Sequence, residues 1–304
     1  MSEVLTSPFI EKGSMESIQD EDMKLCTEAV NGDAAALTTL VRKHQRWVYN
    51  IALRLVLSPI DAEDLAQESW IRIVTRLSQF QGKSAFRTWA YRIVVNRFRD
   101  GKRKKLEQRI TTFYNYGEEL DSIPFETLNL PVELEPYQEL VVEDAKVGCM
   151  LGMLLCLNRE QRIVYVLGEI FEAPSAVAAE ILEITPATFR KRLERARRDL
   201  TSFMNEKCGL LNEANPCRCN RKTQSFIQAG WVDPYNLKFT AHHVARLKQV
   251  APKRSQALCE LTEVQYGDLF REHPILDGPD IALRLRDLIR DQSLRCTFGL
   301  DEMS

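Results

Sequence analysis

A dense set of cationic side chains in the second half of the chain has the residue types that recognise DNA. Its members are Arg190, Lys191, Arg192, Arg195, Arg197 and Arg198. Arginine and lysine can pair with base edges in the major groove of duplex DNA and can also hold phosphates. The alternative is an ordinary solvated basic helix, because basic amphipathic helices are common.

The residues around this set predict the helix that would carry it. Thr185 is a suitable N-cap, and Pro186 fits the first helical position because its missing N–H has no partner there in any helix. Phe189, Leu193, Ala196 and Leu200 follow at helical spacing and predict a buried stripe. The segment from 163 to 200 therefore reads as a helix-turn-helix whose second helix is basic and can enter a major groove.

A second cluster interleaves aromatic rings with cations between residues 86 and 105. It contains Phe86, Trp89, Tyr91 and Phe98 together with Arg87, Arg92, Arg97, Arg99 and Lys102, Arg103, Lys104 and Lys105. Flat rings can stack on unpaired bases while cations follow the backbone, so this composition suits single-stranded DNA. A core position is equally open for Trp89.

The net charge of −2 conceals a strong alternation along the 304 residues. Nine Lys and Arg accompany two acids between Arg87 and Arg109, whereas nine Asp and Glu and no cation lie between Glu118 and Asp144. The stretch from Arg190 to Arg198 is basic again. A near-neutral average therefore does not exclude a nucleic-acid partner.

Composition and motifs exclude several other classes. No run of about 18 apolar residues predicts a membrane span, and the acidic N-terminus does not resemble a secretory signal. Gly82-Lys83-Ser84 resembles the end of a phosphate-binding loop, but the required glycine is replaced by Leu77. The four histidines form no catalytic pattern, so we expect a cytoplasmic protein that is not an enzyme and requires no cofactor.

The cysteines leave two interpretations open. Eight cysteines in a chain without a signal peptide indicate reduced intracellular thiols. Cys208, Cys217 and Cys219 lie close in sequence, with His242, His243 and Cys259 further on, and thiolates with an imidazole can bind zinc. Their spacing is not a standard ligand pattern, so zinc is a candidate cofactor and free thiols are the alternative.

Helical periodicity predicts an all-α chain: a helix bundle, a helix-turn-helix and a small, mostly helical C-terminal extension. One periodic stretch runs from Met23 to Leu55, a helix begins at Asp61 as an acidic N-cap with Leu65, Ile73, Leu77 and Phe80 inside, and a third begins near Ser84 and continues into the lysines after Gly101. The predicted divisions are a flexible N-terminus (1–20), a helical domain (21–106), an acidic linker (107–138), a helix-turn-helix domain (139–204) and the extension (205–304).

Two blocks of the chain together resemble the bacterial extracytoplasmic-function (ECF) sigma factors of RNA polymerase. The first block carries NGDAAALTTLVRKHQRWVYNIALRL, DAEDLAQESWIRIV and FQGKSAFRTWAYRIVVNRFRDGKRKK. The second carries LNREQRIVYVL and AAEILEITPATFRKRLERARRDL. The resemblance implies a specificity subunit that binds core polymerase, recognises the minus-35 and minus-10 promoter elements and helps to melt DNA.

The resemblance also implies roles for individual residues. Those expected to contact core polymerase are Asp61, Asp64, Gln67 and Glu68. Those expected at the minus-10 element are Phe80, Lys83, Trp89, Arg92, Asn96, Arg97, Arg99, Lys102 and Arg103, with Asn96 and the loop from Phe80 to Ser84 around an extruded base. Those expected at the minus-35 element are Thr185, Thr188, Arg190, Lys191, Glu194, Arg195 and Arg198, where Glu194 can accept from a cytosine amine.

Three features lie outside the family pattern or allow another function. The turn of the helix-turn-helix has Glu183 where the family usually has glycine, and a positive φ there would cost roughly 1 kcal/mol. We expect residues 205–304 to regulate the sigma core, because Ile281, Leu285, Leu288 and Ile289 need a partner surface, and an anti-sigma factor is a candidate partner. The rival functions are a stand-alone helix-turn-helix regulator and a polymerase-binding adaptor that does not bind DNA.

Overall fold

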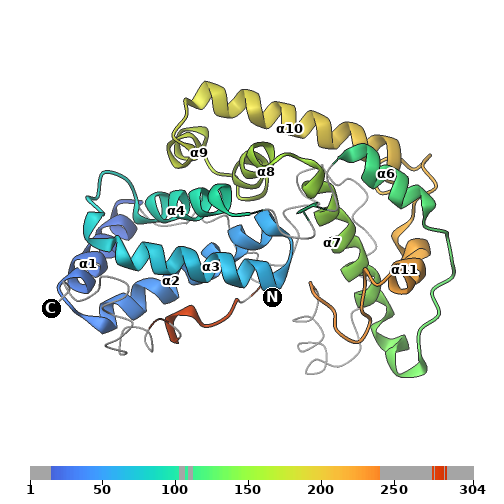
Figure 1. Ribbon diagram of the computed structural model, residues 1–304, viewed down its shortest axis with the longest axis horizontal. Helices are drawn as coiled ribbons and strands as arrows, with labels where there is room; N and C mark the ends of the chain where they lie inside the picture. The colour runs from blue at the N-terminus through green and yellow to red at the C-terminus, as the bar shows by residue number, and fades with distance from the viewer. Residues whose placement is uncertain are drawn as a thin grey trace. The chain divides into compact units, whose positions relative to one another are not determined.

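The computed structural model describes residues 15–102, 107–108, 112–239, 276, 278–283 and 285, and these residues contain helices and no strand (Figure 1). The prediction of an all-α fold is confirmed. No helix in these residues is long and apolar enough to cross a membrane. The chain separates into two compact units: unit 1 comprises residues 1–104, 166–191 and 275–304, and unit 2 comprises residues 105–165 and 192–274.

Unit 1 is built around four helices from the first third of the chain. These are α1 (Met15–Val30), α2 (Ala34–Val56), α3 (Pro59–Thr75) and α4 (Phe86–Asp100), joined later by the short π-helix η3 (Val166–Ile170) and by α9 (Ser175–Leu182). Trp70, Phe86, Leu40 and Ile51 are fully buried and form its core. α2 packs against α1 and α3, and α4 packs against α3 and α9.

The first helical stretch is two helices rather than one, and it begins earlier than its periodicity indicated. α1 starts at Met15 and ends at Val30, and the turn that follows contains Gly32, which has a φ of 94°. The Asp33 carboxylate then caps α2 by accepting hydrogen bonds from the amides of Ala35 and Ala36, at 2.8 and 3.1 Å. A local cap and a glycine thus interrupt an apolar pattern that would otherwise continue.

The bounds of α3 and α4 also differ from those expected. α3 begins at Pro59 with Ser58 as its N-cap, so Asp61 lies inside the first turn instead of capping it. α3 ends at Thr75, and Leu77 belongs to the 3₁₀ turn η1 (Leu77–Gln79). α4 ends at Asp100 and does not continue into the lysines that follow Gly101.

Part of the C-terminal extension packs on α2 within unit 1. Ile281 and Leu285 are buried, as their pattern predicted, and the Ile281 amide donates to Gln45 Oε1 over 3.0 Å. Asn50 exchanges two hydrogen bonds with the backbone of Leu276, at 2.8 and 3.0 Å. Leu288 and Ile289 lie outside the described residues.

Unit 2 contains the linker and most of the second half of the molecule. Its helices are α6 (Phe113–Ser122), η2 (Val132–Tyr137), α7 (Gln138–Cys156), α8 (Arg159–Tyr165) and α11 (Cys219–Gln228), and it holds α10 (Pro186–Lys207) from Arg192 onward. The linker therefore includes a regular helix, α6, whose N-cap Thr112 accepts from the amide of Asn115. α11, which has no counterpart among the expected helices, packs against α7.

Candidate nucleic-acid and polymerase interfaces

The basic helix α10 begins as its sequence predicts. The Thr188 amide donates to Thr185 Oγ1 over 3.2 Å, and the two hydroxyl oxygens lie 2.9 Å apart. Pro186 is the first residue of the helix. Phe189, Leu193, Ala196 and Leu200 are all buried, so the predicted apolar stripe is confirmed.

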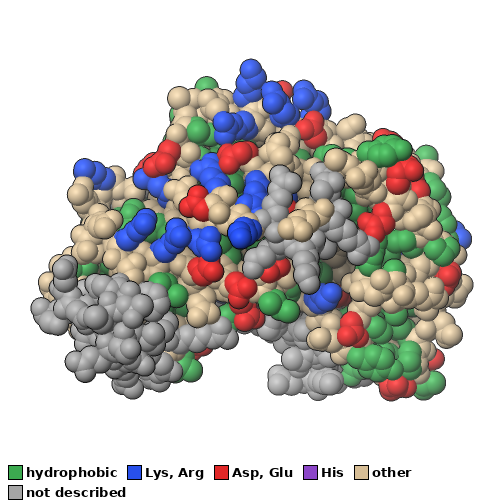
Figure 2. Space-filling view, viewed as in Figure 1, with side chains coloured by type: hydrophobic (Ala, Val, Ile, Leu, Met, Phe, Trp, Pro, Cys, Tyr) green, Lys and Arg blue, Asp and Glu red, His purple; other side chains and the backbone are tan. Residues whose placement is uncertain are grey.

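The opposite face of α10 presents its charges to solvent. The exposed residues on it are Arg190, Lys191, Glu194, Arg195, Arg197 and Arg198. Within the described part of the chain, Arg190, Lys191, Glu194 and Arg195 make no ion pair, whereas Arg198 has Asp199 at 3.8 Å. Figure 2 shows Lys and Arg side chains gathered over this helix. A capped helix with one buried apolar face and one exposed cationic face suits the major groove, where Arg and Lys can donate hydrogen bonds to base edges.

The turn before α10 carries backbone strain. Glu183 has φ 57° and ψ 42°, which is the left-handed region that favours glycine. Its amide and that of Ile184 close α9 through hydrogen bonds to α9 carbonyls. The positive φ considered for this residue is therefore present, and the helix-turn-helix geometry forms with glutamate in place of glycine.

The aromatic residues of α4 serve mainly as core. Phe86, Tyr91 and Phe98 are buried, so three of the four rings expected to stack on bases are inaccessible in this conformation. Trp89 is half-buried, and its ring centroid lies 5.4 Å from that of Phe80 and 5.8 Å from that of Phe86. Only Trp89 and Phe80 among these rings keep surface that a base could cover. Sequence periodicity had not distinguished the two faces, because cations occur on both.

The cations of α4 are engaged by neighbouring side chains. Arg92 donates to the Glu180 carbonyl over 3.0 Å, and its guanidinium lies 3.6 Å from the carboxylate of Glu180 and 3.8 Å from that of Glu183. Arg97 forms an ion pair with Glu68 of α3, and Arg99 donates to Asn96 Oδ1 over 3.3 Å. No local pattern in the sequence indicates that these two acids, Glu180 on α9 and Glu183 at its C-cap, face α4.

The remaining residues expected at the minus-10 element have mixed positions. Gly82, with a φ of 67°, shapes the loop that carries Lys83, and a Cβ there would overlap the side chain of Met23. Lys83 and Lys102 are exposed, and Arg103 lies outside the described residues. The structure thus brings Phe80 and Trp89 together and leaves both lysines accessible.

The residues expected at core polymerase lie on α3. Asp64 and Glu68 are exposed and Asp61 and Gln67 are half-buried, while the neighbouring Ala62, Leu65, Ala66 and Ser69 are buried. Positions separated by three or four residues share a helix face, so Asp61, Asp64 and Glu68 form one acidic edge. Glu68 forms an ion pair with Arg97 of α4.

The cysteines of the extension are joined by one from α7. Cys149, Cys208, Cys217 and Cys219 are close enough that neighbouring thiolate charge raises the pKa of several members, after the larger effect of burial. The pKa of Cys219 rises to about 12. Across the described residues, no three His, Cys, Asp or Glu side chains are placed to hold a metal ion, and His242, His243 and Cys259 lie outside those residues. Zinc binding by Cys208, Cys217 and Cys219 stays a prediction.

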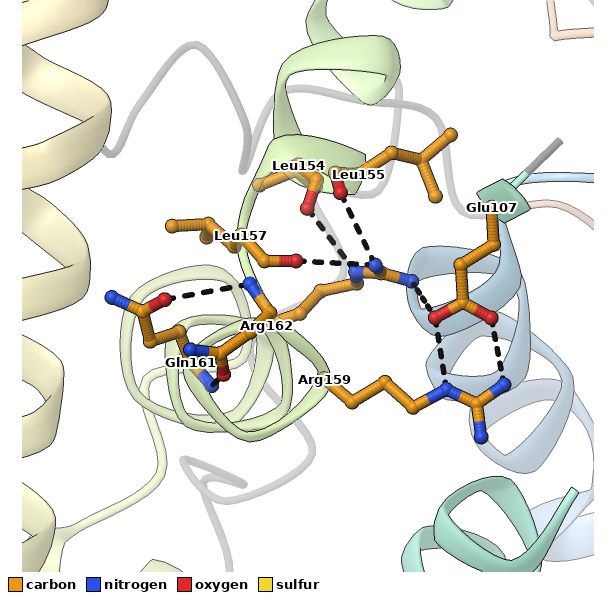
Figure 3. Close-up of polar contacts among 8 residues, drawn as sticks. Glu107, Leu154, Leu155, Leu157, Arg159, Gln161 and Arg162 are labelled. Atoms are coloured by element: carbon orange, nitrogen blue, oxygen red, sulfur yellow. Dashed lines mark hydrogen bonds and ion pairs between the residues drawn. The ribbon is translucent and has the colours of Figure 1, made fainter. Parts of the chain in front are cut away.

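A buried network around Arg162 supports α8, and no local pattern in the sequence indicates it (Figure 3). Arg162 is 1% exposed and donates to the carbonyls of Leu154, Leu155 and Leu157 at 3.1 to 3.4 Å. Glu107 lies 3.4 Å from Arg162 and accepts two hydrogen bonds from Arg159, at 2.9 and 2.7 Å. Burial lowers the pKa of Arg162 to about 10. One guanidinium thereby caps the end of α7 and fixes α8 to it.

The helix-turn-helix, with the exposed cations of α10, and the four-helix core of unit 1 are typical of all-helical DNA-binding proteins. Two family models match the same regions: Sigma-70 region 2 over residues 40–107 and Sigma-70, region 4 over residues 148–200. Both matches end before the C-terminal extension begins.

Curated relatives identify the family more closely. The ECF RNA polymerase sigma factor SigE of Mycolicibacterium smegmatis is 30% identical over 189 residues, which cover 61% of this chain and 69% of SigE. The ECF RNA polymerase sigma factor SigW of Bacillus subtilis is also 30% identical over 189 residues, which cover 60% of this chain and 96% of SigW. The chain belongs to the ECF sigma factors of RNA polymerase.

A solved structure gives a weaker likeness. CnrH, in its complex with the cytosolic domain of CnrY, is 22% identical with a TM-score of 0.44, covering 62% of this chain and 99% of CnrH.

Proposed function

We propose that this sigma factor divides its work between three helices: α10 reads the minus-35 element as duplex, α4 with the Phe80 loop holds the minus-10 strand, and α3 binds core polymerase. The observation that carries the proposal is the solvated face of α10, with Arg190, Lys191 and Arg195 opposite a fully buried stripe. A helix of this kind needs no rearrangement of its own side chains before it meets base edges.

The minus-10 role rests on Trp89, Phe80 and the cations around them. The accessible surface of a half-buried ring can stack on a base extruded from the duplex, and Lys83 and Lys102 are available to the strand backbone. Arg92 and Arg97 would first exchange their carboxylate partners for phosphates. We therefore infer that α4 acquires its full affinity for DNA only after α9 moves away from it.

The proposal requires core polymerase and promoter DNA as partners. Because both are found in the bacterial cytoplasm, we propose that the protein acts there. The acidic edge of α3 fits a basic or polar surface on core polymerase. A stand-alone regulator would have no use for this edge beside a strand-binding helix, and the family of the chain does not favour that alternative. An anti-sigma factor stays a prediction.

Run-off transcription tests the proposal. Core polymerase is supplied with the purified chain and fragments from upstream regions of its source genome, and we expect transcripts that depend on the chain. Asp64→Ala should abolish association with core while duplex binding persists. Arg190→Ala with Arg195→Ala should do the reverse, lowering affinity for the minus-35 duplex by about 1–3 kcal/mol per contact.

Asn205→Ala is the matched control, because Asn205 is exposed on the same helix beyond the DNA-binding face. Loss of the same function in both sets of variants would refute the division of roles. DNA binding without transcripts, together with no association with core, would support the stand-alone regulator instead.

A further inference from the structure

Helix α11 lies along the part of the linker that follows α6. The Glu126 amide donates to the Arg221 carbonyl over 2.8 Å, and the Asn129 amide donates to Gln224 Oε1 over 2.9 Å. The Ser225 hydroxyl donates to the Pro124 carbonyl over 3.0 Å. Because residues 123–131 have no regular secondary structure of their own, α11 supplies hydrogen-bond partners that a helix or sheet would otherwise provide.

Lys222 connects the same helix to the end of α6. Its ammonium donates to the carbonyls of Leu120, over 2.8 Å, and Ile123, and it lies 4.1 Å from the centroid of the Phe125 ring. The residue is 2% exposed. A cation at the C-terminal end of a helix is favoured by its unpaired carbonyls and by the helix dipole. Burial lowers the pKa of Lys222, and the nearby Asp121 carboxylate acts in the opposite direction.

The contacts continue to the acidic side chains of the linker. Gln228 Nε2 donates to Glu126 over 2.8 Å, and the Tyr235 hydroxyl donates to Glu133 over 3.3 Å. The hydrogen bonds of Asn129, Gln228 and Tyr235 are exposed to solvent, and Phe125 remains 38% exposed. A segment held in this way can open at a lower free energy than a segment buried in an apolar core.

The contact between α11 and the linker connects two different parts of the chain. The linker joins the two regions that match the sigma family models, whereas α11 lies beyond both of them. We propose that α11 is an intramolecular clasp: it holds the linker from Leu120 to Asn129 in a folded conformation, and its release precedes productive assembly with core polymerase. The regulatory half of this inference rests on the proposed function, and the physical clasp does not.

Hydrogen exchange of the full-length chain tests the clasp. Lys222→Met keeps the length and apolar contacts of the side chain and removes its three donors. Gln224→Ala with Ser225→Ala is a second, milder variant. Both should accelerate exchange of the Glu126 and Asn129 amides about tenfold, with the Arg162 amide of α8 unchanged as a sign of intact folding. Asn220→Ala, on the exposed face of α11, should leave exchange as in the unmodified chain.

Run-off transcription with the same proteins tests the regulatory consequence. The clasp variants should reach half-maximal transcript at an about tenfold lower chain concentration, because the binding-competent fraction is larger. Unchanged exchange in both variants would overturn the clasp. Faster exchange with an unchanged transcription midpoint would overturn its regulatory role. Absence of transcripts from every form would refute the proposed function, and the exchange result would still decide the clasp.

Discussion

Helices α4 and α10 are both rich in arginine, but they keep their charges in different states. The guanidinium groups of α4 are paired with acids or amides of α3, α9 and α4 itself, and three of its four aromatic rings are buried. On α10, Arg190, Lys191 and Arg195 face solvent. Figure 2 shows acids among the cations over α4, whereas cations dominate over α10. In the proposed division of roles, α10, which reads duplex DNA, has solvent-exposed cations before DNA arrives. The cations of α4, which holds the opened strand, stay paired until the strand displaces their partners.

The largest effect is expected where the support of α8 is removed. Arg162→Met should lower the free energy of unfolding of unit 2 by about 3 kcal/mol, because it leaves three carbonyls unpaired and Glu107 with one partner fewer. Thermal and urea unfolding measure this loss. Arg159→Met, at a more exposed position that spares the carbonyls, should cost clearly less. Equal stability of the Arg162 variant and the unmodified chain would show that the network is not a support.

Lowering the pH should reduce the stability of unit 1, which contains His44 and α4. His44 is buried, its Nε2 lies 3.1 Å from both carboxylate oxygens of Asp22, and its ring centroid lies 5.1 Å from that of Phe86. Burial lowers the pKa of His44, Arg87 and Lys43 lower it further, and Asp22 opposes them. Below pH 6.5 the unfolded chain then binds more protons than the folded chain, so stability falls as the pH drops from about 6.5 toward the folded pKa.

Unfolding followed between pH 7.5 and 5 tests this expectation. His44→Gln should flatten the dependence on pH in that window. A variant with the same pH dependence as the unmodified chain would place the titration elsewhere.

The strained turn should give a smaller effect on stability than the Arg162 network. Glu183→Gly relieves a left-handed conformation and should stabilise the fold by about 1 kcal/mol, raising Tm by about 2 °C. Little is lost with the Arg92 ion pair, because the Glu183 side chain is 63% exposed. Glu183→Ala removes the same carboxylate but keeps a Cβ, so it should bring no gain. A lower Tm for the glycine variant would indicate that the ion pair outweighs the strain.

The same contrast shows how far sequence reasoning reaches. The cap, the bounds and the buried stripe of α10 follow from local chemistry, because Thr185, Pro186 and an apolar spacing act within one helix. Arg92 and Glu180 are 88 positions apart, and Lys222 and Leu120 are 102 positions apart. The Arg162 network depends on buried carbonyls and on Glu107, which lies 52 positions from Arg159. No local pattern indicates any of these contacts. Gly32 and Asp33 are local signals that one helix ends and another begins, but the apolar spacing continues across them and favours a single helix.

Affinity for two kinds of DNA tests the contrast between α4 and α10 most directly. Glu180→Gln with Glu183→Gln removes the carboxylates that occupy Arg92 and leaves α10 intact. At low salt, this variant should bind the single strand of the minus-10 element about threefold more tightly than the unmodified chain, because exposed pairs of this kind contribute less than about 1 kcal/mol. Its affinity for the minus-35 duplex should not change. An unchanged affinity for the single strand, or an equal gain for both DNAs, would contradict the account.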